Sequence, residues 1–178
     1  SRPGVELRVS RPVTTLPSLE DLKQRNHRKL LITDGAVALV GGRNLSHEYY
    51  TGFAEVALTT RSLWREVPWL DAGARIEGPA VARLDEIFRD SWLEAGGAPF
   101  PPLPMPPRQP PGSSPVRVIS HDGLRDAATL EAFLALVDGA QSHLYVINGF
   151  PLLLEIQHAL LRAARRGVRV RTLFGNLT

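Results

Sequence analysis

Residues 27–44 read HRKLLITDGAVALVGGRN, and this stretch predicts a β-hairpin. Two apolar runs rich in β-forming residues, 29–33 and 36–40, flank the dipeptide Asp34-Gly35. This two-residue connection suits a type I′ turn, because both of its central residues need a positive φ angle. Gly41 and Gly42 then end the second run. The pattern is therefore strand, tight turn, strand.

Polar groups that could bind phosphate stand at both ends of this hairpin sequence. His27 and Lys29 are two residues apart on a predicted extended segment, so their side chains should leave the same face. An imidazole can attack phosphorus, and an ammonium group can neutralise charge on the non-bridging oxygens. Gly42 allows a close backbone approach, and Asn44 can donate to a phosphoryl oxygen. The stretch predicts a site for a phosphodiester.

The composition favours a globular chain with anionic partners. The chain has 178 residues, of which 43% are hydrophobic, and this is enough to bury a core. Its formal net charge of +3 favours nucleic acid, acidic lipid or phosphate esters without choosing among them. Cysteine is absent, which excludes disulfides, thiolate zinc sites and cysteine nucleophiles. No apolar run in the sequence is long enough to cross a bilayer.

The chain divides at a stretch rich in proline and glycine. Residues 95–115 have the composition of a semi-extended linker between residues 1–94 and residues 116–178. In the first part, we expect a short strand at 5–9 and a helix from 80 to about 93. In the last part, we expect strands at 116–120, 143–148 and 168–174 and helices at 124–137 and 152–166. This alternation predicts right-handed crossovers and a largely parallel sheet, hence an α/β fold.

The order H-x-K-x₄-D-x₆-G-G-x-N in residues 27–44 resembles the HKD motif of the phospholipase D superfamily. Residues 43–50, which read RNLSHEYY, and residues 71–81 resemble the segments that follow the motif in bacterial cardiolipin synthases. One difference is His47, at a place where these synthases often have an acidic residue. The resemblance covers most of the chain apart from the linker.

This resemblance implies a fold and a division of the chain. Residues 1–94 would be the C-terminal part of a first phospholipase D-like half, with the HKD motif, and residues 116–178 the start of a second half. The fold would be a mixed or mostly parallel sheet flanked by helices. Only one motif is present and both ends look cut, so we expect a fragment whose active site is incomplete.

The resemblance also implies a mechanism. In the family, two motifs meet at one site: one histidine attacks phosphorus to form a phosphohistidine, and the other protonates the leaving alcohol. Neither a metal nor another cofactor is required. The implied roles are catalytic for His27, Lys29 and Asp34, phosphate-binding for Lys29, Asn44 and Gly42, and supporting for Glu48.

The expected activity is phosphatidyl transfer between phospholipids, as in cardiolipin synthesis, or phospholipid hydrolysis. The partners would be an anionic phospholipid, an alcohol or water as acceptor, and a second HKD half from the missing part of the chain or from a dimer partner. Family resemblance suggests a peripheral location at a bacterial membrane. Two alternatives stay open: a superfamily nuclease that cleaves DNA, with nucleic acid the less favoured substrate, and a catalytically incomplete unit that only folds or associates.

Several site residues also have simpler interpretations. Asp34 is equally explained as a turn former, because Asp-Gly suits the hairpin by itself. Asn44 could cap a local turn, and Glu48 could be a surface carboxylate. A further hypothesis is that residues 116–174 fold back and complete the sheet of residues 29–40.

Overall fold

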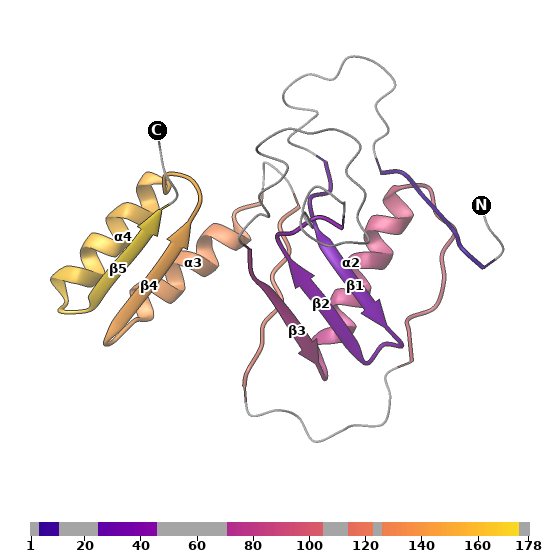
Figure 1. Cartoon of the computed structure of the whole chain (residues 1–178), viewed down its shortest axis with the longest axis horizontal. Helices are drawn as coiled ribbons and strands as arrows, with labels where there is room; N and C mark the ends of the chain where they lie inside the picture. Colours follow the sequence, from indigo (N-terminus) through magenta and orange to yellow (C-terminus); the bar gives the residue numbers. More distant parts are fainter. Residues whose placement is uncertain (1–3, 11–24, 46–70, 105–113, 123–125, 175–178) are drawn as a thin grey trace, which may run out of the picture. The chain divides into compact units, whose positions relative to one another are not determined.

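The computed structural model describes residues 4–10, 25–45, 71–104, 114–122 and 126–174. Residue contacts divide the chain into two compact units, Ser1–Val118 and Ile119–Thr178, each with its own sheet (Figure 1).

The first unit contains a three-stranded antiparallel sheet in the order β1-β2-β3. Its strands are β1 (Lys29–Thr33), β2 (Val37–Gly41) and β3 (Gly73–Glu77). The predicted hairpin of β1 and β2 is confirmed. The Ala36 N–H donates to the Thr33 carbonyl at 3.0 Å across the turn, and both turn residues have the positive φ angles expected, 54° for Asp34 and 64° for Gly35.

The register of the hairpin differs from the prediction by one residue. Thr33 pairs with Val37, so three residues rather than two separate the paired strands. This register places Leu30 opposite Val40 and Ile32 opposite Ala38. Residues directly opposite each other share a face of an antiparallel pair, so these apolar side chains form one continuous apolar face.

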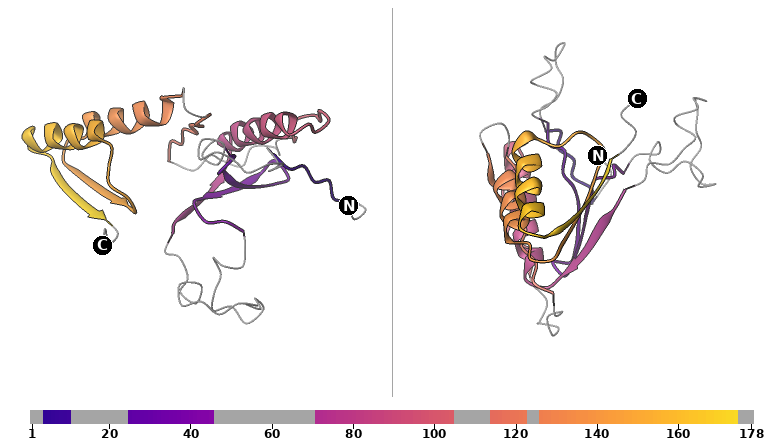
Figure 2. Two further views of the ribbon diagram at one scale, coloured as in Figure 1. Left: turned by 90° about the horizontal axis from the view of Figure 1, so that it is seen from above. Right: turned by 90° about the vertical axis from the view of Figure 1, so that its left-hand side faces the viewer.

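Helix α2 (Ala80–Glu94) covers that apolar face, as Figure 2 shows. The predicted helix start at residue 80 is confirmed, and Gly78 and Pro79 lead into it. The helix contributes Val81, Leu84 and Ile87 to the buried cluster, and the sheet contributes Ala38. The partly buried residues packed around this cluster are Leu30, Ile32, Val40, Ile76 and Val118.

The second unit is a βαβ arrangement preceded by a helix. Its elements are α3 (Ala128–Gly139), β4 (His143–Asn148), α4 (Leu154–Arg165) and β5 (Arg169–Phe174). Strands β4 and β5 pair in parallel, and α3 and α4 lie on one side of them (Figure 2). These four elements and the α/β fold class were predicted correctly.

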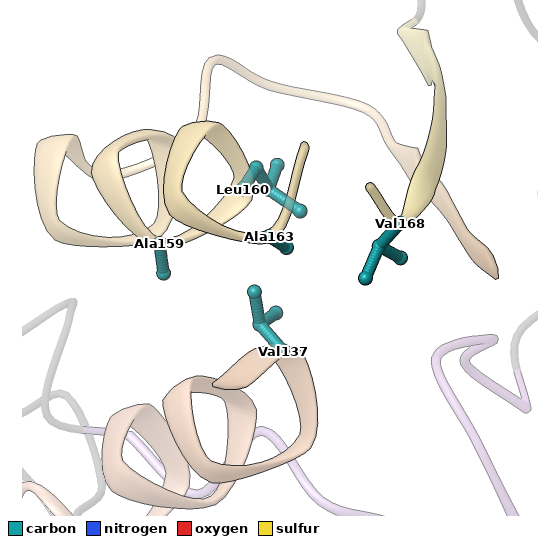
Figure 3. Close-up of a cluster of buried hydrophobic side chains, with 5 residues drawn as sticks. All are labelled: Val137, Ala159, Leu160, Ala163 and Val168. Atoms are coloured by element: carbon teal, nitrogen blue, oxygen red, sulfur yellow. The ribbon is translucent and has the colours of Figure 1, made fainter. Parts of the chain in front are cut away.

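The core of the second unit lies between the two helices and the start of β5. Figure 3 shows Val137 of α3 pointing toward Ala159 and Ala163 of α4. Leu160 and Val168 complete the buried cluster. Small alanines allow the helices to approach closely, and this matches the dense packing of protein interiors.

Arginines at the end of α4 tie it to α3. Arg162 and Arg166 both pair with Asp138, and the Arg162 Nη2 to Asp138 Oδ2 distance is 3.2 Å. Arg166 Nη2 also donates to the carbonyls of Val137 and Asp138 at 3.1 and 3.0 Å. These carbonyls belong to the last turn of α3, where the helix ladder ends, and the Val137 carbonyl also accepts from the Ala140 N–H at 3.4 Å. These two arginines thus have a structural role.

Three expectations about the fold were wrong, and one strand was missed. Residues 5–9 and 116–120 form no strand, and Val118 instead packs on the core of the first unit. Strand β3 was not predicted. The hypothesis that residues 116–174 complete the sheet of residues 29–40 fails, because the two groups of strands form separate sheets.

The stability of the first unit should depend on Leu84 far more than on Leu93 of the same helix. Leu84 is 5% exposed and Leu93 is 47% exposed. We expect Leu84→Ala to lower the free energy of unfolding by about 3 kcal/mol, since it leaves a cavity in the core. The matched variant Leu93→Ala should cost less than about 1 kcal/mol. Urea denaturation of the two variants checks this, and equal losses would contradict the packing described here.

Candidate functional site

The candidate site lies at one end of the three-stranded sheet, on the face away from α2. Leu30 and Ile32 point toward α2, so Lys29 and Leu31 lie on the opposite face. Lys29 pairs with Gly41, and Gly41 pairs with Gly73. One row across the sheet therefore has a lysine on the outer strand and no side chain on the next two.

Lys29 is half-buried, and its side chain turns back along its own strand. Its Nζ donates to the His27 carbonyl at 2.6 Å. Burial lowers the pKa of Lys29 below its ordinary value of 10.5, and the negative charge of Asp71 opposes this effect by raising it. The ammonium group thus binds the backbone at His27, and a carboxylate from a distant part of the chain acts on its charge.

His27 is exposed and lies just before β1 rather than within it. The neighbouring backbone is held by a local bond, in which the Arg28 N–H donates to Asn26 Oδ1 at 3.1 Å. Strand alternation therefore does not set the direction of the His27 side chain. What links His27 to Lys29 in the structure is the hydrogen bond from the Lys29 ammonium to the His27 carbonyl.

Asp34 lies at the other end of β1, in the hairpin turn. Asp34 is five positions beyond Lys29, the first residue of β1, which is roughly 16 Å along an extended strand. The turn packs against residues that follow α2, since a Cβ on Gly35 would lie 2.7 Å from the Pro104 carbonyl oxygen. The structure brings His27, Lys29 and Gly42 to one end of the sheet and leaves Asp34 at the other.

Gly42 and Asn44 follow the end of β2, at the same end of the sheet as the start of β1. Gly42 is exposed and Asn44 is half-buried. Glu48, the expected supporting residue, and His47 lie outside the residues that the structure describes.

Asp71 is a site residue that the sequence did not single out. Its carboxylate lies against Gly42, where a Cβ would be 2.8 Å from Oδ2 and 3.0 Å from Oδ1. Its negative charge also raises the pKa of Lys29, against the effect of burial. Asp71 belongs to the segment 71–81, whose family resemblance was noted, but no spacing links it to the motif. Only the pairing of β3 with β2 brings it there.

No described helix is both long enough and apolar enough to cross a membrane.

Comparison with known proteins finds cardiolipin synthases among the relatives of this chain. Cardiolipin synthase A of Pseudomonas putida is 30% identical over 151 residues, which are 84% of this chain and 29% of that protein. Cardiolipin synthase A of Pseudomonas aeruginosa (strain LESB58) is 32% identical over 151 residues, with the same shares. The chain thus spans 29% of the length of these curated relatives. No family model and no solved structure matches the chain.

Proposed function

We propose that this chain, a relative of the cardiolipin synthases in the phospholipase D superfamily, supplies one half of an active site for phosphatidyl transfer between phospholipids. The observation that carries the proposal is the HKD motif of residues 27–44 in a chain similar to cardiolipin synthase A over 84% of its length. The position of Lys29 and Gly42 at the end of the sheet where His27 lies supports it.

The reaction has two steps, each at phosphorus. A histidine nitrogen forms a bond to the phosphorus of an anionic phospholipid, and the bond from phosphorus to the leaving alcohol oxygen breaks. A second histidine gives that oxygen a proton. The acceptor alcohol, or water in hydrolysis, then loses a proton to the second histidine and attacks phosphorus, and the first histidine leaves. His27 is one of these two histidines, and the other comes from a second HKD half.

Lys29 stabilises the transition state in this scheme. Negative charge collects on the non-bridging oxygens as phosphorus becomes five-coordinate, and a fixed ammonium group offsets it most strongly where water is partly excluded. The half-buried position of Lys29 suits this role. Asn44 adds an amide donor to the same phosphate, and Glu48 supports the site as an acceptor.

We assign Asp34 to the turn rather than to the reaction. Its φ of 54° and its position at the far end of β1 support this choice. Asparagine adopts the left-handed region as readily as aspartate does. We therefore expect Asp34→Asn in the full-length enzyme to keep kcat within about twofold of the parent, because the turn persists. Steady-state kinetics measures this, and a loss of a hundredfold or more would show that the Asp34 carboxylate acts in catalysis.

The substrate is tested by offering the full-length protein two phosphodiesters. Vesicles of an anionic glycerophospholipid should give transferred or hydrolysed lipid, identified by mass spectrometry. Double-stranded DNA should stay intact. Cleavage of DNA without lipid turnover would replace the proposal with the nuclease alternative, and nuclease binding would weaken steeply with salt.

The proposal also has the enzyme acting at a membrane surface. Its substrate is a lipid, and a net charge of +3 favours an anionic surface. The sedimentation of the full-length protein with anionic vesicles, compared with neutral vesicles, measures this preference.

A further inference from the structure

The carboxylate of Asp71 occupies the space that the missing side chain of Gly42 leaves open. A Cβ on Gly42 would meet Oδ2 at 2.8 Å, Oδ1 at 3.0 Å and Cγ at 3.3 Å. Real Cβ atoms essentially never come as close as the first of these distances, so an alanine at position 42 requires the carboxylate to move. Gly42 and Asp71 therefore fit each other.

Local structure fixes the direction of this carboxylate. Oδ1 accepts a hydrogen bond from the Ala72 N–H at 2.7 Å, directly before β3 begins. The pairing of Gly73 with Gly41 holds the start of β3 against the end of β2. A Cβ on Gly73 would lie 3.0 Å from the Val40 carbonyl oxygen, so this approach of the two strands is close.

The part of the sheet between Asp71 and Lys29 consists of glycines. Lys29, Gly41 and Gly73 form one row across the three strands. Adjacent strands are about 4.8 Å apart, and neither Gly41 nor Gly73 places a side chain in this row. The Lys29 side chain itself turns back to the His27 carbonyl and leaves the row open. The charge of Asp71 acts on the Lys29 ammonium across it.

We propose that Asp71 is the positioning residue of Lys29. In this proposal, Gly42 lacks a side chain in order to admit the Asp71 carboxylate, rather than to let the backbone approach the substrate. The idea rests on the proposed function, because it explains how the phosphate-binding lysine is kept charged and aimed. Lys29 donates a hydrogen bond to the backbone carbonyl of His27. Asp71, which is not a residue of the motif, would therefore affect two residues of the motif through Lys29.

The physical need for such a partner follows from burial. Removing an ammonium group from water disfavours its charged form, and this lowers the pKa of Lys29. A nearby carboxylate raises that pKa again, so Lys29 stays protonated over a wider pH range. Without Asp71, the pKa falls further, and the alkaline limb of the activity profile moves to lower pH.

A double-mutant cycle in the full-length enzyme separates the two roles of Gly42. We expect Gly42→Ala to lower kcat/KM about tenfold or more in the parent, but less than about twofold in the Asp71→Ala background, where the space is free. Equal losses in both backgrounds would assign Gly42 to the substrate and overturn the proposal. Glu77→Gln, at the opposite end of β3, is the control and should leave kcat/KM unchanged.

A second measurement does not depend on activity. The chain has two lysines, Lys23 and Lys29, so the Lys29 side chain can be titrated by NMR after selective labelling. The pKa of Lys29 should fall in Asp71→Asn and stay unchanged in Glu77→Gln. An unchanged pKa in Asp71→Asn would refute the positioning role. If the parent proves inactive on lipid, this titration still tests the role of Asp71, so the two failures remain distinct.

Discussion

Replacement of His27 by alanine is expected to abolish phosphatidyl transfer by the full-length enzyme, with a fall in kcat of about a thousandfold or more. The reason is that each of the two histidines acts in both steps of the proposed reaction. One forms and then breaks the bond to phosphorus, and the other gives and then accepts a proton. The measurement is lipid product formed from anionic vesicles per unit time.

The control for this variant is another histidine of the same chain. His158 lies exposed on α4, outside the motif and in the other unit. His158→Ala should keep the parent kcat. A parent-like rate in His27→Ala would leave His27 without a chemical role and would favour the interpretation that this chain only folds or associates.

Replacement of Lys29 by methionine should be almost as severe. Methionine keeps most of the length and apolar character of the stem, so the loss measures the charge. Removing one preorganised group that stabilises transition-state charge costs roughly a hundredfold to a thousandfold in kcat. The effect should appear in kcat more than in KM, because the oxygens gain charge on the way to the transition state.

Lys23, the other lysine of this sequence, gives the matched control for this variant. Lys23→Met removes the same charge outside the motif and should leave kcat unchanged. Equal effects of the two substitutions would point to a general loss of attraction for anionic vesicles. In that case, Lys29 would have no specific place at phosphorus.

Short-range signals were sufficient to predict most of the fold. The hairpin follows from Asp34-Gly35 between two β-rich runs, and the turn has the backbone angles that this dipeptide favours. The end of α4 was predicted from Gly167, which has a φ of 93°. The N–H groups of Gly167 and Val168 donate to the carbonyls of Ala164 and Ala163, a helix end that glycine permits.

Long-range pairing could not be predicted in the same way. Strand β3 reads GARIE, a short sequence with little alternation, and it is a strand because β2 offers it an edge. The opposite error occurred at residues 116–120, which were predicted to be a strand and form none. Their alternating pattern instead reflects the packing of Val118 on the core of the first unit. Periodicity shows which side chains will be buried but does not show which backbone will find a partner.

The candidate site illustrates the same distinction. The motif predicted that His27, Lys29 and Asp34 act together, yet β1 begins at Lys29 and carries Asp34 to its other end. Conversely, Asp71 is far from Lys29 in sequence and acts on it through space. The resemblance to cardiolipin synthases was predicted from the motif and from segments over most of the chain apart from the linker, and the similarity to cardiolipin synthase A over 84% of the chain confirms it.

The central claim is that His27 and Lys29 act on the same phosphorus atom, and the double variant tests it most directly. Groups that act as a unit give strongly non-additive losses. The account predicts that kcat/KM of the His27→Ala and Lys29→Met double variant, measured on anionic phospholipid vesicles, will be close to that of the weaker single variant. A double variant whose loss equals the product of the two single losses would contradict it.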